Sequence, residues 1–139
     1  MVACIPVDIN HNQVCVETAK TLLQQSQGLA GRKSIKDNYA MLFDMRSLGT
    51  TSRAFWTMQS MKFPLDMVFI KDNKIITIMY GVKPCNYDDM NKCQVFGGFP
   101  VEYVIETKAG NANKWGLHIS QHINFVFLAQ KKMNLNKKS

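Results

Sequence analysis

The fold is decided by residues 55–70, which read FWTMQSMKFPLDMVFI. The second half of this segment, residues 65–70, is apolar apart from Asp66 and predicts a strand buried in the core. Pro64 has no amide hydrogen and restricts the residue before it to an extended conformation, so the chain bends ahead of this strand. We therefore predict a shaped loop and a core strand, paired in a hairpin with the strand at 75–80 that follows a polar turn.

Further short strands are predicted from alternating or apolar runs over residues 5–9, 13–17, 40–43, 55–58, 101–106 and 123–128. A helix is expected over residues 18–27, with Leu22 and Leu23 on its apolar side and Gly28 ending it. A second short helix is expected over residues 109–116. Many short strands and one or two short helices predict a mostly β (α+β) protein, folded as a compact small β-barrel or sandwich.

The chain has 139 residues, of which 46% are hydrophobic and 19% are charged, as is typical of one globular domain. The net charge is +7, but four lysines lie in the final segment 131–139, which leaves +3 on the rest of the chain. We predict a single globular domain over residues 1–130 and a basic, disordered tail over residues 131–139. No specific nucleic-acid partner is expected; binding through the tail is the alternative, and it would depend steeply on salt.

Cys85 and Cys93 bracket a polar loop between two strand-like segments, an arrangement that favours a disulfide over two free thiols. Their spacing differs from the Cys-x-x-Cys pairs of zinc sites. A disulfide would place the protein in an oxidising compartment. The pairing of Cys4 and Cys15 stays open. The start of the chain, MVAC, is similar to a bacterial lipoprotein cleavage site, so Cys4 is a candidate lipid anchor, with a buried cysteine as the alternative.

Arg32 and Asp66 are the leading candidates for a functional pair, because each lies near a residue that shapes the backbone, Gly31 and Pro64. If the loop at 28–32 packs over the bend at 56–66, the two side chains meet in a buried ion pair or line a shared cleft. The pair then serves either as a clasp that holds the loop or as part of a ligand site. The predicted ligand-binding residues are Arg32, Trp56, Met58, Gln59 and Asp66.

Several other groups have both a structural and a functional interpretation. Trp56 with Met58, Met61 and Met67 forms core packing, an apolar pocket wall or a thioether copper site. His118 and His122 have metal-ligand spacing on a helix, but their apolar neighbours favour a turn. Glu102 and Glu106 share a strand face, where two carboxylates could act as acid and base, although an exposed edge strand explains them more simply. No metal site, cofactor or recognised catalytic motif is predicted.

The chain resembles the bacterial and archaeal family called domain of unknown function 192 from about residue 14 to residue 127. The segments that carry the resemblance are Gly28-Leu29-Ala30-Gly31-Arg32, Met41-Leu42-Phe43, residues 57–70, Pro84-Cys85, Cys93, residues 102–106 and Ala109-Gly110. The family often has methionine at the position of Ala30 and tryptophan at that of Thr57, and its late Gly-Asp turn reads Ser120-Gln121 here. The resemblance implies a small, β-rich, barrel-like fold that is often exported, and it implies no activity.

These observations predict an exported β-rich binding or accessory domain of the cell envelope, acting as a monomer on a ligand or envelope partner. The alternative is a hydrolase of a cell-envelope substrate with Asp66 as the base. A periplasmic or extracellular location is expected, with a membrane anchor if Cys4 is lipidated; reduced cysteines would instead indicate the cytoplasm. The chain has no apolar run of about 20 residues and no basic-then-apolar start typical of a secretory signal.

Overall fold

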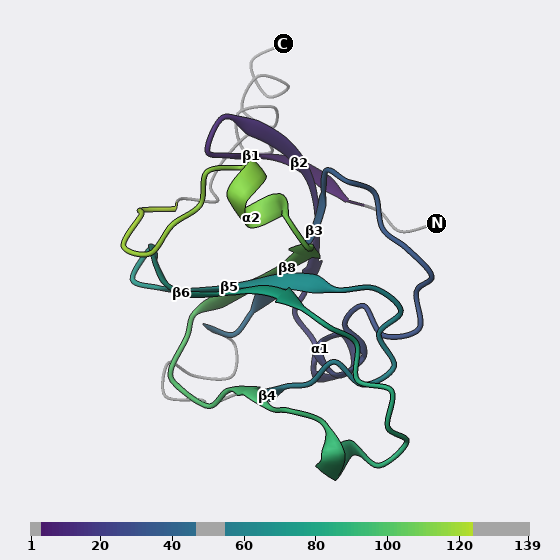
Figure 1. Ribbon diagram of the computed structural model, residues 1–139. Helices are drawn as coiled ribbons and strands as arrows, with labels where there is room; N and C mark the ends of the chain where they lie inside the picture. Colours follow the sequence, from purple (N-terminus) through teal and green to yellow (C-terminus); the bar gives the residue numbers. More distant parts are fainter. Residues whose placement is uncertain (1–3, 47–54, 124–139) are drawn as a thin grey trace.

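The computed structural model describes residues 4–46 and 55–123 (Figure 1). The strands are β1 (Ile5–Ile9), β2 (Asn12–Ala19), β3 (Tyr39–Asp44), β4 (Phe55–Trp56), β5 (Leu65–Lys71), β6 (Lys74–Val82), β7 (Phe96–Gly97) and β8 (Tyr103–Lys108); the helices are α1 (Leu22–Gln27) and α2 (Asn111–Lys114), with a 3₁₀ turn η2 (Met90–Lys92). Six strands form one sheet in the order β1-β2-β3-β8-β5-β6, and β4 pairs with β7 in a second, small sheet.

The large sheet is mixed and open. Only β2 and β3 are parallel, and α1 lies in the connection between them, whereas the other neighbours are antiparallel. In the described part of the chain β1 and β6 form its two edges, so it does not close into a barrel. The predicted mostly β (α+β) class is confirmed, and the sandwich is the architecture that fits.

Both predicted hairpins are confirmed, and their turns explain the asparagines found there. Asn10 and His11 join β1 to β2 with φ of 51° and 69°, and Asp72 and Asn73 join β5 to β6 with φ of 53° and 60°. Two consecutive left-handed residues give the turn that matches the twist of paired strands, and Asn and Asp tolerate this conformation better than most residues.

Helix α1 begins later than predicted because β2 extends to Ala19. A capping box starts the helix: the Thr21 hydroxyl accepts from the Gln24 amide, and the Gln24 side chain accepts from the Thr21 amide. Leu22 and Leu23 are 67% and 78% exposed, so the prediction of an apolar inner side was wrong. The helix is instead attached through Gln25, whose side-chain amide donates to the carbonyls of Ala19 and Asp44.

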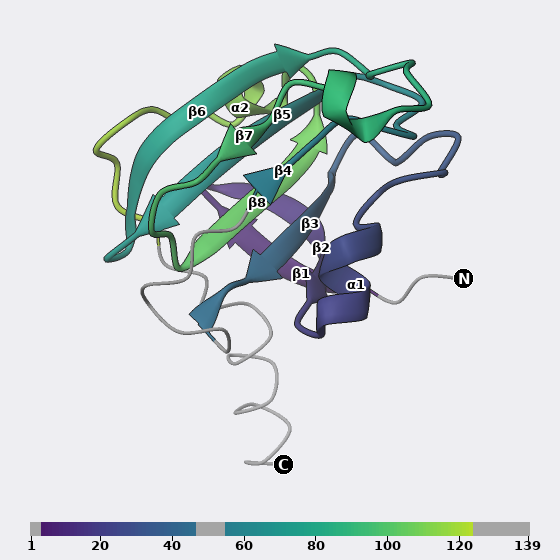
Figure 2. The same ribbon diagram turned by 90° about the horizontal axis from the view of Figure 1, so that it is seen from below.

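Both faces of the large sheet are covered, and each has its own hydrophobic cluster (Figures 1 and 2). Ala40 and Leu42 of β3 contribute to the cluster on the side of α2. Met41 and Phe43, which point to the opposite face, pack in the cluster that includes Trp56 of β4. Figure 2 shows α1, β4 and β7 in front of that second face. This double coverage explains why β3 is buried along its whole length.

The carboxylate of Asp66 ties β5 to two other parts of the chain. It is 1% exposed and accepts hydrogen bonds from the backbone amides of Gly81, Gly110 and Ala112, at 2.8, 3.0 and 2.9 Å. Gly81 belongs to β6, and the other two residues form the start of α2. Three backbone donors therefore satisfy one buried carboxylate, which positions α2 over the sheet.

Three sequence predictions are changed or fall outside the described residues. The strand expected at 55–58 is limited to Phe55–Trp56, because the chain then turns and the Met58 carbonyl accepts from the Cys85 amide. Of the strand expected at 123–128 only Ile123 is described, and the predicted tail at 131–139 lies outside. Neither helix in the described ranges has the length and apolar character needed to cross a bilayer.

Replacing Asp66 by alanine should lower the free energy of unfolding by about 3 kcal/mol, because the buried amide of Ala112 and the part-buried amides of Gly81 and Gly110 all lose their acceptor. Urea denaturation measures the change. Asp37→Ala is the matched control, since its carboxylate is exposed and forms a surface ion pair with Lys108, and it should change stability little. Equal stability of the two variants would contradict the structural role of Asp66.

Candidate functional site

A cavity of about 970 Å³ lies between the large sheet and the elements that cover its second face. The described residues around it come from the end of α1 and the glycine loop (25–30), from the β4 segment (55–57 and 59–61), from the loop before β7 (Asn91, Cys93 and Val95), and from the sheet (Phe43 and Glu106). The cavity therefore occupies the place where the sequence predicted a cleft, between the glycine loop and the bend that follows Trp56.

Glu106 is the residue that gives this cavity chemical character. It lies on β8, in the middle of the sheet, directly opposite Met41 of β3 and Met67 of β5. The residue is 5% exposed, and burial raises the pKa of its carboxyl group to about 8. No described residue offers it a hydrogen bond or a neighbouring cation. Glu106 is thus a buried carboxyl group that borders a cavity and has no partner among the described residues.

The backbone of Gly28 covers the carboxyl group at close range. Gly28 ends α1 with φ of 50°, and its amide donates to the Gln24 carbonyl at 2.8 Å. A Cβ atom at this position would lie 3.6 Å from Oε1 of Glu106 and 3.2 Å from the ring of Phe43. Glycine here both permits the turn and leaves space beside the carboxyl group.

The walls of the cavity are apolar near the sheet and polar towards solvent. Trp56 packs edge-on against Phe43 at 6.0 Å between ring centroids, and it is 8% exposed. Leu29 and Met61 complete this buried part. The cavity is also lined by four residues that carry a polar side-chain amide: Gln25, Gln27, Gln59 and Asn91. Such a combination of an apolar interior and a few polar groups is typical of small-molecule sites.

Arg32 does not face this cavity. Its guanidinium forms an ion pair with Glu17 of β2, with Nη2 3.0 Å from Oε1, and donates to the hydroxyl of Tyr39 at 2.9 Å. The Tyr39 hydroxyl also donates to Glu17. Burial and the hydrogen bond to Glu17 raise the pKa of Tyr39. Arg32 therefore holds the glycine loop against β2 and β3. This is the structural role that was predicted for Arg32, but its partners are Glu17 and Tyr39 instead of Asp66.

The predicted pairing of Arg32 with Asp66 is wrong. Asp66 points to the α2 face of the sheet, since it is bound by the amides of Gly110 and Ala112, whereas its neighbour Met67 belongs to the opposite cluster. The alternation of side chains along β5 thus removes Asp66 from the cavity and from the role of a catalytic base there. Glu17, which the sequence analysis did not consider, takes its place beside Arg32.

The other predicted ligand-binding residues divide between two places. Trp56 and Gln59 line the cavity beside Glu106. Met58 is 2% exposed and belongs to the second cluster; it borders a separate cavity of about 580 Å³ near β6. Ligand binding by any of these residues remains a prediction. Met61 and Met67 also lie in that cluster, as expected if these methionines pack in the core.

Glu106 was assigned to an exposed edge strand, and this prediction was wrong. Strand β8 lies between β3 and β5, at the centre of the sheet. Glu102 precedes that strand and its carboxylate accepts from the Asp72 amide, so the two glutamates do not act together. The sequence VIETKAG at residues 104–110 offered a signal, because it places the carboxylate of Glu106 directly after two apolar strand residues. This pattern does not show whether the strand is central or at an edge, because strand order depends on the tertiary fold.

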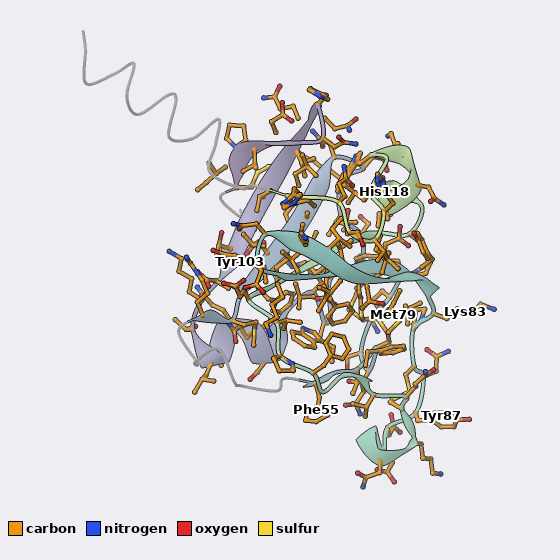
Figure 3. The ribbon with its side chains drawn as sticks, turned by 90° about the vertical axis from the view of Figure 1, so that its left-hand side faces the viewer. Phe55, Met79, Lys83, Tyr87, Tyr103 and His118 are labelled. Atoms are coloured by element: carbon orange, nitrogen blue, oxygen red, sulfur yellow. A yellow bond between two sulfur atoms is a disulfide. The ribbon has the colours of Figure 1, made fainter. Side chains whose placement is uncertain are left out.

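His118 lies on the side of α2 (Figure 3), and no histidine is among the described residues that line the cavity. His118 is exposed, with Nδ1 3.2 Å from the Gly116 carbonyl, and His122 forms a β-bridge with Lys74. The segment between them is a turn, as the sequence favoured. Within residues 4–46 and 55–123, no three His, Cys, Asp or Glu side chains gather as metal ligands would.

The four cysteines form two pairs at disulfide distance. Cys85 and Cys93, paired by the sequence analysis, have Cα atoms 5.7 Å apart. Cys4 of the N-terminal segment and Cys15 of β2 have Cα atoms 5.3 Å apart. Cys93 borders the cavity, so the first bridge helps to position the loop that forms one of its walls.

The comparison with known families agrees with this fold. The family model DUF192, "Uncharacterized ACR, COG1430", matches residues 5–125. The chain belongs to the DUF192 family. None of the curated proteins is significantly similar to this DUF192 chain in sequence.

Two crystal structures are similar to the DUF192 domain described here. A protein of unknown function from Novosphingobium aromaticivorans DSM 12444 is 22% identical, with a TM-score of 0.71 over 86% of this chain and 83% of that one. A candidate transcription regulator from Sinorhizobium meliloti 1021 is 30% identical, with a TM-score of 0.68 over 80% of this chain and 81% of that one. Both similarities support the fold.

Stability should fall as the pH rises from about 5 to 8, because the folded state keeps the proton of Glu106 to higher pH than the unfolded state does. The expected loss is on the order of 1 kcal/mol per pH unit, since one pKa unit corresponds to about 1.4 kcal/mol. Glu106→Gln should remove this loss and make the protein more stable than the native chain at pH 8. Urea denaturation at pH 5, 6.5 and 8 measures it.

Glu102→Gln is the control for this series, because it removes a carboxylate four positions earlier that meets a backbone amide at the sheet end. It should retain the pH dependence of the native chain. A native protein whose stability is constant between pH 5 and 8 would show that Glu106 is not held in the neutral form.

Proposed function

We propose that this protein is a ligand-binding domain that acts outside the cytoplasm, and that its ligand occupies the cavity beside Glu106. The observation that carries the proposal is the combination of a cavity of about 970 Å³ with a buried carboxyl group that has no partner among the described residues. No described side chain has a fully buried oxygen or nitrogen without a hydrogen bond, so the carboxyl oxygens of Glu106 keep access to the cavity, where a ligand can pair with them.

The composition of the cavity favours binding over catalysis. Glu106 is the single ionisable side chain among the described residues around it, because Cys93 is at disulfide distance from Cys85. Hydrolysis of the kind first considered needs a second group to activate water or stabilise an anion. Asp66, the base of that alternative, lies on the other face of the sheet. We therefore place binding ahead of the enzyme alternative.

The two cysteine pairs support a location in an oxidising compartment, since disulfides persist there and are rare in the cytosol of most organisms. They also bear on the lipid-anchor hypothesis for Cys4. A sulfur atom bonded to Cys15 is not available for a thioether to lipid. We therefore favour the paired form of Cys4 in a protein of the periplasm or the cell exterior.

Binding can be tested with the neutral apolar dye N-phenyl-1-naphthylamine, whose fluorescence increases in apolar surroundings. Saturable binding is expected. Thr57→Trp, which adds bulk at a half-buried position of the cavity wall, should weaken it at least tenfold. Asn113→Trp is the control, because this exposed residue of α2 lies on the opposite face of the sheet. Absence of saturable binding, or equal binding by both variants, would contradict the proposal.

The compartment can be tested through the state of the cysteines. Protein isolated from its native cells under acid quenching should incorporate no iodoacetamide until it is reduced. Reduction and alkylation should then destabilise it by about 2–3 kcal/mol for the bridge between Cys85 and Cys93, which lie 8 positions apart. Full labelling without reduction would indicate free thiols and contradict an oxidising location.

A further inference from the structure

We infer that the ligand of this cavity carries a positively charged amine on an apolar body, and that Glu106 is the counter-ion of that amine. The inference depends on the proposed binding function and specifies the chemical class of the ligand. It is based on the position of Glu106 in the sheet, on the charges around it and on the aromatic side chains nearby.

Two carboxylates lie in one row across the sheet, and within the described ranges only one of them is paired with a cation. Glu17 of β2 is opposite Met41 of β3, and Met41 is opposite Glu106 of β8. Strands in a sheet are about 4.8 Å apart, so the two glutamates are separated by about 10 Å. Glu17 has the guanidinium of Arg32 at 3.0 Å. Glu106 also lies opposite Met41, and it borders the cavity, but no described residue supplies a cation to it.

The neighbouring ionisable groups do not supply that cation. On the same face of the sheet, Lys108 of β8 forms an ion pair with Asp37 at 2.8 Å, and Tyr39 of β3 is hydrogen-bonded to Glu17. Lys71 is the last residue of β5 and is not among the residues that line the cavity. Helix α1 and residues 55–61 contain no ionisable side chain. An ion pair at Glu106 therefore needs a charge from outside these elements.

The surroundings of the carboxyl group suit an ammonium ion with an apolar substituent. The ring of Phe43 and Oε1 of Glu106 both lie within 4 Å of the point that a Cβ on Gly28 would occupy. Trp56 packs against Phe43 and lines the same cavity. Aromatic faces attract cations, and the apolar walls would bury a hydrocarbon chain. An anionic ligand would instead meet a carboxyl group and no described basic residue of the cavity.

The test compares n-octylamine with 1-octanol, which have nearly the same shape but differ in charge. Both are used to displace N-phenyl-1-naphthylamine at pH 8.5, where the amine is protonated and Glu106 is largely ionised. The amine should displace the dye at a concentration at least tenfold lower than the alcohol does. In Glu106→Gln, which removes the charge and keeps the size, this preference should fall below about threefold, while the dye itself still binds.

Glu102→Gln is the matched control and should keep the preference for the amine, and circular dichroism verifies that each variant is folded. Binding of the dye without any preference for octylamine would overturn the amine inference and leave the binding function standing. Failure of the dye to bind at all would overturn the binding function itself. A preference that persists in Glu106→Gln would also overturn the inference, because it would assign recognition to another group.

An alkylammonium group can belong to a free amphipathic amine or to a lysine side chain of a peptide. The peptide acetyl-Leu-Lys-Leu-amide, with acetyl-Leu-Gln-Leu-amide as its uncharged counterpart, provides the second arm of the same displacement assay. A charge preference in either arm that is lost in Glu106→Gln supports the inference. The arm with the tighter binding identifies the source of the amine.

Discussion

The arrangement of the large sheet and of helix α2 above it depends on the hydrogen bonds that the Asp66 carboxylate accepts. It is buried on β5 and takes its three hydrogen bonds from the backbone of β6 and of the segment that begins α2. Because the donors are backbone amides, their positions are fixed by the path of the chain. These hydrogen bonds therefore determine where α2 lies relative to the sheet. The hydrophobic cluster that contains Ala112 and Trp115 then forms beneath it.

The opposite face of the sheet contains the contrasting case. Glu106, on the strand next to β5, is nearly as buried as Asp66, but no described residue donates a hydrogen bond to it. A carboxyl group in this state keeps its proton to unusually high pH, as the raised pKa of about 8 indicates. Asp66 is thus explained by the fold, whereas Glu106 is not, and such groups at cavities are frequent at functional sites.

The cavity depends on elements that contribute little to the central sheet. Arg32 attaches the glycine loop to Glu17 and Tyr39, and Gly28 brings the backbone next to Glu106 without filling the space. The β4 segment supplies Trp56, and the loop closed by Cys85 and Cys93 supplies another wall. The sheet therefore provides a fixed carboxyl group, and the loops over it form the other walls of the cavity.

Patterns within short segments were enough to predict the local structure, namely both hairpins, the buried strand β3 and the end of α1 at Gly28, and they favoured the pairing of Cys85 with Cys93. It also indicated a cleft between the glycine loop and the bend after Trp56. Which charged residues meet depends instead on how the strands are arranged in space. Strand order places β8 at the centre and buries Glu106, and the alternation along β5 turns Asp66 to the other face. Local sequence patterns do not contain this information, because strand order and the partners of buried charges arise from contacts between residues far apart in the chain.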